Sequence, residues 1–192
     1  MGSNVDEGSY FVPVPKNITV DGFNSFVLNF YGPQIGPQVL KLYPPSAYPA
    51  TPFASPSFYA AEHIWGDFGM TCPARRAVSW FSRKQRGTYL YQFTRIPTGA
   101  QFSYHSCEIP FVFLAKDLLL SADDLAISLS MSTLWNTFAR TGAPSAPDVW
   151  PAYTPASDKN LFIDTKLSVG SGLRKPQCDL WDSLLTRACE AW

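Results

Sequence analysis

The segment Gly87–Thr94 constrains the fold of this chain most strongly. It reads Gly-Thr-Tyr-Leu-Tyr-Gln-Phe-Thr, is rich in β-branched and aromatic residues, and is followed by the turn signal Pro97-Thr98-Gly99, which together predict a β-strand. His105 lies in the loop beyond the carboxyl end of this strand. In open α/β sheets that edge is where ligands bind, so the position alone makes His105 a candidate functional residue.

A helix is predicted from residue 122 to residue 141. Ser121-Ala122-Asp123-Asp124 has the form of a capping box in which Asp124 replaces the usual Glu. Apolar residues then recur at i, i+3, i+4 and i+7, namely Met131, Leu134, Trp135 and Phe138. Gly142 and Pro144 follow the last turn, and both residue types are typical of a helix end.

The remaining elements are predicted from weaker patterns. The apolar spacing from Phe58 to Ser82 favours two short helices broken around Thr71-Cys72-Pro73, and Leu180–Ala188 is expected to form a terminal helix. Leu161–Asp164 is expected to be a short edge strand. Prolines are dense from Gly32 to Pro56, which predicts an irregular connection on the surface and no long helix.

Composition excludes two classes of partner. The 192 residues fit one compact domain with a sizeable core. Lys plus Arg and Asp plus Glu number 15 each, without a run of like charge, so neither a nucleic-acid-binding protein nor a polybasic membrane anchor is indicated. No apolar run approaches the roughly 18 residues that span a bilayer. An uncharged or small partner is therefore expected.

The sequence indicates two different compartments. The first residues, Met-Gly-Ser-Asn-Val-Asp-Glu-Gly, lack the basic and apolar regions of a signal peptide, which points to the cytosol. In contrast, Asn17-Ile18-Thr19 is a glycosylation sequon, a short pattern that also arises by chance. The cysteines leave a disulfide open, which would be typical of a secreted protein.

No metal site and no cofactor are predicted. The cysteines show no C-x-x-C spacing and only two histidines accompany them, which argues against zinc; these cysteines are Cys72, Cys107, Cys178 and Cys189. His63, the second histidine, is interpreted as structural.

His105 is interpreted as a catalytic base, against the alternative of an ordinary loop histidine satisfied by a hydrogen bond or by water. A histidine base needs an acceptor that holds one ring nitrogen so that the other faces the proton of the nucleophile, and a buried carboxylate supplies that acceptor. Glu7, in a Gly-bounded loop near the start of the chain, is the candidate acceptor. Its neighbour Asp6 is the alternative, because chemistry alone does not separate two adjacent carboxylates.

Two segments carry a resemblance to a known family. Asn-Val-Asp-Glu-Gly-Ser-Tyr-Phe, residues 4–11, resembles the acidic-residue loop of the type B carboxylesterases, the cholinesterase-like branch of the α/β-hydrolases. His-Ser-Cys-Glu-Ile-Pro-Phe-Val-Phe, residues 105–113, resembles that family's segment His-Gly-x-Glu-x-Pro-Phe-Val-Phe. Further similar segments follow in the same order over almost the whole chain: Leu42-Tyr43-Pro44, Asp67 before Cys72-Pro73, residues 87–91, residues 135–142 and Trp150-Pro151-Ala152-Tyr153.

The resemblance implies roles for several residues. Glu7 is similar to the family's triad acid and His105 to its general base, in the chain order of serine, acid and histidine that this fold uses. Tyr10 and Phe11 resemble aromatic residues that line the substrate gorge, although core residues would look the same. Glu108 either supports the histidine loop through buried hydrogen bonds or is an ordinary, partly exposed acid.

The resemblance also implies one disulfide. Cys72 and Cys178 are similar to a disulfide pair of secreted family members; the alternative is two buried thiols. Cys107 departs from the family pattern, as does Ser106 where Gly is common, and neither change removes a triad role. Cys189 is expected to be free or to pair with another molecule.

The nucleophile of such an enzyme is not found in these residues. The pattern G-x-S-x-G does not occur, and neither does a Gly-rich segment that would donate oxyanion-hole amides. Residues 1–192 are therefore expected to be the C-terminal portion of a type B carboxylesterase domain, an α/β fold with an incomplete sheet and covering helices. The strand that would end at Gly2-Ser3 is expected to be absent, and helices would expose apolar faces.

Two functions remain open at this point. The chain resembles part of a serine esterase that acts on small carboxylic esters, and alone it is expected to be inactive. The alternative is a catalytically inactive, cholinesterase-like module for extracellular adhesion or binding. Retention of Glu7 and His105 favours the first.

Overall fold

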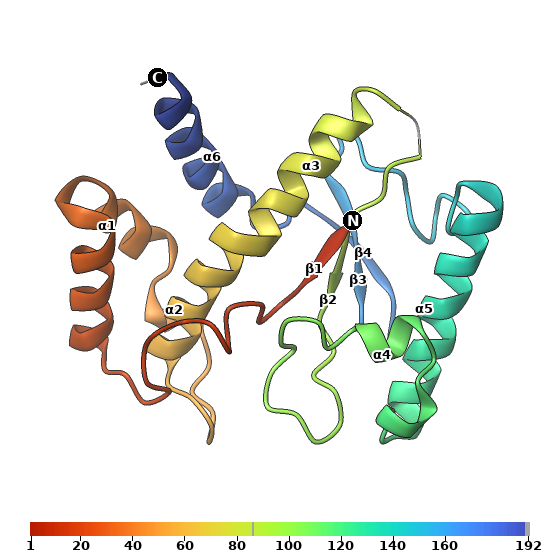
Figure 1. Ribbon diagram of the computed structural model, residues 1–192, viewed down its shortest axis with the longest axis horizontal. Coiled ribbons are helices and arrows are strands. Elements are labelled where there is room, and N and C mark those ends of the chain that lie inside the picture. Colours follow the sequence, from red (N-terminus) through yellow and green to blue (C-terminus); the bar gives the residue numbers. More distant parts are fainter. Residues whose placement is uncertain (86, 191–192) are drawn as a thin grey trace.

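A computed structural model describes residues 1–85 and 87–190 and places a small mixed sheet between two groups of helices (Figure 1). Within these residues the sheet has four strands in the spatial order β1 (Gly2–Asn4), β2 (Tyr91–Phe93), β3 (Lys159–Ile163) and β4 (Ser168–Ser171). The first three strands are parallel, and β4 runs antiparallel to β3. Because parallel strands align their carboxyl ends, the loops that follow β1 and β2 meet at one edge of the sheet.

The helices flank the sheet. Along the chain they are α1 (Val20–Leu42), α2 (Pro56–Gly66), α3 (Cys72–Ser82), α4 (Ile109–Val112), α5 (Ala122–Thr141) and α6 (Lys175–Glu190), with 3-10 turns at Pro45–Ala47 and Lys116–Leu118 and a π-helical turn at Asp67–Thr71. In Figure 1, α1, α2 and α6 lie on one side of the strands, and α4 and α5 lie on the other. This is a mixed α/β arrangement, as expected.

Three apolar clusters connect these layers. The largest joins α1, α2 and α6 through buried residues that include Phe23, Ile64 and Trp181. A second joins the strands to α5 through Phe93, Leu161, Ile163 and Met131. In the third, Val78 of α3 contacts Leu90 and the partly buried Phe162. Neighbouring residues of β3 thus serve different clusters, because successive side chains of a strand point to opposite faces.

Several predicted elements are confirmed. The helix expected at 122–141 is α5, in which the Ser121 hydroxyl accepts a hydrogen bond from the Asp124 N–H at 3.1 Å. Gly142 ends that helix in the left-handed conformation, with φ of 78°. The strand expected at Gly87–Thr94 is shorter and comprises β2, and the terminal helix is longer than predicted.

The prediction for Gly32–Pro56 is wrong in its first part, where α1 continues to Leu42. Gly32, with φ of 74°, interrupts this helix, and Pro33 begins its second segment. A proline fits at the first helical position because its missing N–H would be unpaired there anyway. Dense prolines predict the absence of a long helix, whereas Pro33 starts the second segment of one.

Three further predictions need correction. Leu161–Asp164 is not an edge strand, because β3 pairs with β2 on one side and with β4 on the other. The strand expected to be absent at Gly2-Ser3 is present as β1, where Gly2 lies opposite Tyr91. The two helices expected between Phe58 and Ser82 are α2 and α3, but a π-helical turn joins them without leaving the helical conformation.

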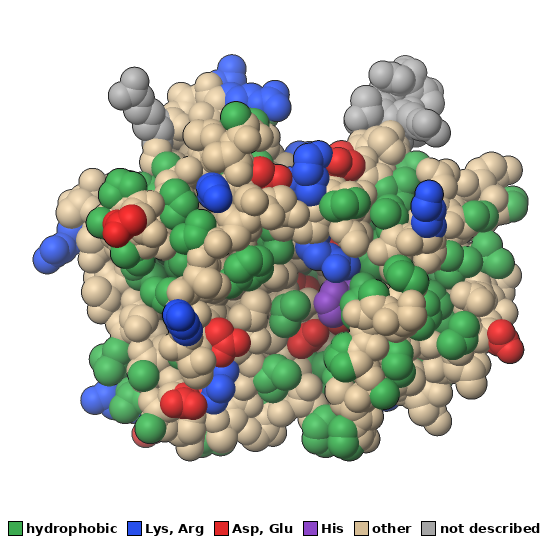
Figure 2. Space-filling view, turned by 180° about the vertical axis from the view of Figure 1, so that it is seen from behind, with side chains coloured by type: hydrophobic (Ala, Val, Ile, Leu, Met, Phe, Trp, Pro, Cys, Tyr) green, Lys and Arg blue, Asp and Glu red, His purple; other side chains and the backbone are tan. Residues whose placement is uncertain are grey.

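Apolar side chains are exposed on several elements, as predicted. Large apolar residues at least half exposed include Phe30, Phe68, Trp80, Phe113, Leu118 and Leu120. Figure 2 shows hydrophobic side chains spread over one face of the molecule, between charged ones. Among the described residues, no helix is both long and apolar enough to cross a membrane.

Candidate catalytic acid and base

The acid loop and the histidine loop lie together because they follow two adjacent parallel strands. The Val5 N–H donates to the Phe93 carbonyl at 3.0 Å, and the Asp6 N–H donates to the Ser103 carbonyl at 3.1 Å. Asp6 and Tyr104 form an isolated parallel bridge. These backbone bonds extend the pairing of β1 and β2 beyond the strands and fix the loop that carries Glu7 beside the loop that carries His105.

Glu7 and His105 are in direct contact. The Nδ1 atom of His105 lies 2.6 Å from Oε2 of Glu7, and the Asn4 N–H donates to Oε1 of the same carboxylate at 2.7 Å. The Glu7 side chain is 7% exposed and that of His105 is 44% exposed. Burial raises the pKa of Glu7, and the hydrogen bonds from Asn4 and His105 partly offset this rise. The geometry is that of a histidine oriented by a buried acid, with its second ring nitrogen unengaged by Glu7.

Asp6 takes a different position. Its Oδ2 accepts a hydrogen bond from the Ser103 N–H at 2.8 Å. Its carboxylate lies in a group with Glu62 and His63 of α2, whose ligand atoms are within 4.8 Å of one another. Of the two adjacent carboxylates, the structure therefore brings Glu7 to His105.

Asn4 connects the two loops and was not predicted from the sequence. Its Nδ2 donates to the Tyr104 carbonyl at 2.7 Å and to Oε2 of Glu108 at 2.6 Å, while its backbone N–H holds Glu7. Asn4 is 1% exposed. The supporting hydrogen bond considered for Glu108 is thus present, and Asn4 is the residue that provides it.

Ser106 occupies a backbone conformation that usually favours glycine. Its φ is 70°, in the left-handed region, which costs an L-residue about 1 kcal/mol. This conformation directly follows His105 and explains physically why a glycine suits the position. Cys107 beyond it is a buried free thiol, and burial raises its pKa to about 12.

Tyr10 and Phe11 lie beside the histidine loop. The Phe11 ring packs edge-on against the imidazole of His105, with ring centroids 5.5 Å apart, and Tyr10 packs against Tyr104 at 5.2 Å. Within the described residues, Tyr10 is 64% exposed and Phe11 is 47% exposed.

The helix α2 supports the acid loop through very close backbone packing. A Cβ atom added to Gly8 would lie 1.9 Å from the Glu62 carbonyl oxygen. On the facing helix, a Cβ added to Gly66 would lie 3.0 Å from Cβ of Glu7. The loop that positions Glu7 therefore requires the absence of a side chain at Gly8.

The group formed by Asp6, Glu62 and His63 lies behind Glu7. Glu62 is fully buried, and burial raises its pKa to about 7. His63 forms an ion pair with Glu62, and its Nδ1 also lies 2.9 Å from the Tyr59 carbonyl oxygen. Outside this group, no described residue donates a hydrogen bond to the Glu62 carboxylate.

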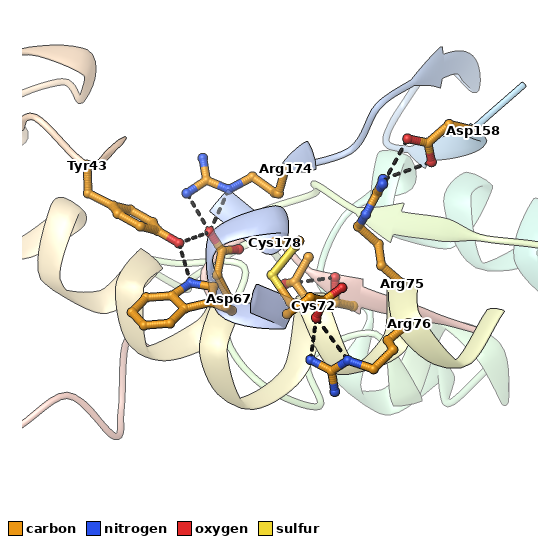
Figure 3. The surroundings of a disulfide bond; sticks show 12 residues. Tyr43, Asp67, Cys72, Arg75, Arg76, Asp158, Arg174 and Cys178 are labelled. Carbon is orange, nitrogen blue, oxygen red and sulfur yellow. Dashed lines mark hydrogen bonds and ion pairs between the residues drawn. A yellow bond between two sulfur atoms is a disulfide. The ribbon is translucent and has the colours of Figure 1, made fainter. Parts of the chain in front are cut away.

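A disulfide joins Cys72 of α3 to Cys178 of α6, as the resemblance implied. Figure 3 shows it beside a buried polar group centred on Asp67, whose Oδ2 accepts hydrogen bonds from the Tyr43 hydroxyl and from Arg174, both at 2.8 Å. The bridge closes a separation of 106 residues. The disulfide holds α6 against α3, which continues from α2 through the π-helical turn, and α2 supports the acid loop. The Cys189 side chain lies outside the part that the structure describes.

One cavity lies away from Glu7 and His105. It has a volume of about 460 Å³, and its lining includes Met1, Gly2, Tyr89, Tyr91 and Trp135. These residues lie at or near the amino ends of β1 and β2 and on the facing surface of α5. The histidine and its acid lie instead at the carboxyl ends of the same strands, where His105 is partly exposed and Glu7 is buried.

Comparison with known proteins shows the family of the chain. A model of the carboxylesterase family matches residues 24–181, so the chain belongs to the carboxylesterase family. It is 28% identical over 151 residues to a cholinesterase of Mus musculus, covering 71% of this chain and 25% of that protein.

Two other relatives match at a similar level. Carboxylesterase 5A of Homo sapiens is 30% identical over 139 residues, covering 64% of this chain and 24% of the relative. An acetylcholinesterase of Gallus gallus is 30% identical over 144 residues, covering 69% of this chain and 19% of the relative. The chain thus spans about a quarter or less of the length of these three relatives.

Proposed function

We propose that this chain supplies the acid and the base of a serine carboxylic-ester hydrolase. The contact of 2.6 Å between His105 Nδ1 and Glu7 Oε2 carries the proposal, together with membership of the carboxylesterase family. In such a mechanism the Nε2 of His105 takes the proton of the serine hydroxyl and later gives it to the leaving alcohol. Glu7 holds the ring in the required tautomer and stabilises the imidazolium that forms.

The nucleophile and the oxyanion hole would come from residues outside this sequence. The pattern G-x-S-x-G is absent from the 192 residues, and the chain corresponds to a quarter or less of its relatives' length. Residues 1–192 would then form the C-terminal portion of the domain. On this proposal the chain alone does not hydrolyse esters, because a base without a nucleophile has no proton to remove.

Tyr10 and Phe11 would line the approach to the scissile ester. Both rings are exposed and flank the histidine loop, which suits contact with the apolar part of a small carboxylic ester. Asn17, which is exposed, would carry a glycan in a secreted protein, and the disulfide between Cys72 and Cys178 suits the same compartment.

A catalytically inactive binding module is the second candidate. The absence of G-x-S-x-G and the exposed aromatic residues favour it. A buried acid bonded to an exposed histidine has no evident use in such a module, however, so the esterase role is preferred.

The decisive experiment compares the chain alone with a complete domain. Residues 1–192 would be produced alone and also joined behind the nucleophile-bearing region of a family relative, and both proteins tested for hydrolysis of p-nitrophenyl butyrate. We expect no turnover from the chain alone, turnover from the joined protein, and loss of that turnover in its His105→Ala variant. If the chain alone hydrolyses the ester and His105→Ala abolishes this activity, the proposal that the nucleophile lies outside these residues is refuted. If the joined protein folds and stays fully active with His105→Ala, the role of His105 is refuted.

A further inference from the structure

The group behind the triad acid has the composition of a metal site. We propose that Asp6, Glu62 and His63 bind one divalent transition-metal ion, with Zn²⁺ as its first probe. Asp6 comes from the acid loop, and the other two residues are neighbours on α2. Each offers one ligand atom, and all three atoms lie within 4.8 Å of one another.

The buried environment of the Glu62 carboxylate points to a ligand. Glu62 is 0% exposed, and its partner is His63 within the same group; outside the group, no described residue donates a hydrogen bond to its carboxylate. A protonated His63 balances only one of the two buried carboxylates, and a buried carboxylate that is not balanced is costly. A divalent ion would neutralise both carboxylates at once.

The donor set fits zinc in kind and in spacing. Carboxylate oxygen and imidazole nitrogen are both zinc ligands, and three protein ligands with a remaining position are typical of accessible sites. Donors bound to one tetrahedral Zn²⁺ at about 2.0–2.2 Å are about 3.3–3.6 Å apart, and the three ligand atoms here lie within 4.8 Å of one another, so small side-chain shifts would form the site.

Neighbouring groups already orient the side chains of Asp6 and His63. The Ser103 N–H donates to Oδ2 of Asp6 at 2.8 Å and so orients this carboxylate. The Tyr48 ring packs against the imidazole of His63, with centroids 4.8 Å apart. Such contacts orient metal ligands and raise metal affinity. The His63 side chain is 11% exposed, which gives an ion a path of entry.

The ion would link α2 to the acid loop. Asp6 directly precedes Glu7, and the Glu62 carbonyl packs against Gly8 on the other side of the acid. A bound metal would therefore stabilise the loop that presents Glu7 to His105. Sequence spacing gives no sign of such a site, because Asp6 is far from Glu62 in the chain.

Calorimetric titration of the metal-free 192-residue chain with ZnCl₂ tests the proposal without any esterase reaction. We expect one Zn²⁺ per chain, a higher melting temperature with the ion, and a nitrogen- and oxygen-only first shell in X-ray absorption. Glu62→Gln and His63→Gln should each weaken binding at least about tenfold. His105→Gln is the matched control for the other carboxylate–imidazole pair and should leave the affinity unchanged.

Three results would overturn the proposal. One is the absence of saturable binding at millimolar Zn²⁺ by a chain that circular dichroism finds folded. A second is unchanged affinity in folded Glu62→Gln, a near-isosteric variant that removes a buried charge. The third is loss of binding in His105→Gln with binding retained in Glu62→Gln, which would move the ion to Glu7 and His105.

Discussion

Nδ1 of His105 and Oε2 of Glu7 lie 2.6 Å apart although 98 positions separate them in the chain. In an active, complete domain that carries these residues, Glu7→Gln should lower kcat by about 10⁴-fold, because an amide no longer favours the required tautomer or the imidazolium. Asp6→Asn is the control and should stay within about tenfold, since Asp6 bonds to the Ser103 N–H and not to the histidine. A larger loss in Asp6→Asn than in Glu7→Gln, measured with p-nitrophenyl butyrate, would reverse the assignment of the acid.

The contact of Gly8 with α2 predicts a severe effect of a single methyl group. Gly8→Ala would place Cβ 1.9 Å from the Glu62 carbonyl oxygen, so helix and loop must separate. We expect the free energy of unfolding to fall by about 3 kcal/mol or more in urea denaturation. Gly69→Ala, whose Cβ would meet nothing within 4 Å, should change it by less than about 0.5 kcal/mol. Equal effects of the two substitutions would contradict the close packing.

Asn4 should matter for stability as much as a core residue. Asn4→Ala removes the hydrogen bonds to the Tyr104 carbonyl and to Glu108 and leaves partly buried acceptors unpaired. The expected loss is about 2–3 kcal/mol of unfolding free energy. Asn17→Ala, at an exposed position, is the control in unglycosylated protein and should cost less than about 0.5 kcal/mol. A neutral Asn4→Ala would show that the two loops are held by other contacts.

The disulfide predicts a stability that depends on redox conditions. Replacement of Cys72 and Cys178 together by Ala should lower the unfolding free energy by about 2–5 kcal/mol, because the bridge closes a separation of 106 residues. Dithiothreitol should lower the melting temperature of the unmodified chain and leave that of the double variant unchanged. An equal response of both proteins to the reductant would indicate that the bridge does not form in solution.

Cys107 should respond to alkaline pH. Burial raises the pKa of its thiol to about 12, from an ordinary value of 9.0. Between these two values the folded chain retains a proton that the unfolded chain releases, so unfolding free energy should fall as pH rises from 9 towards 12. Cys107→Ala should show a shallower decline over that range. In the native protein at pH 8, iodoacetamide should modify Cys107 far more slowly than in urea; rapid native modification would contradict its burial.

Sequence patterns predicted an element correctly where a single local signal, such as a helix cap, was strong. The capping box at Ser121 and the glycine at 142 bound α5 as expected, since caps act within a single turn. The second segment of α1 was missed because a proline signals a break or a start equally, and only the φ of 74° at Gly32 decides between them. β3 was expected at an edge, because its pairing on both sides depends on β4, which carries no strong strand pattern.

The candidate site could be predicted in part, because some of its residues lie in segments that can be recognised locally. Glu7 and His105 lie in recognisable segments, and the resemblance preferred Glu7, but chemistry alone did not distinguish Glu7 from Asp6. Asn4 begins the acidic-residue segment, but no role was predicted for it, and Glu62 belongs to no motif. Both act through contacts across long stretches of chain. Such contacts depend on tertiary packing, which local patterns do not encode.

The parallel pairing of β1 with β2 has a consequence for how the chain folds. Gly2 lies opposite Tyr91, so the whole segment that contains α1, α2 and α3 must be enclosed before this pair of strands forms. Closing so long a loop is slow, and contacts of high sequence separation tend to form late in folding. The meeting of His105 with Glu7 would then be among the last events on the pathway, and a spectroscopic probe on the histidine would report the moment at which folding is complete.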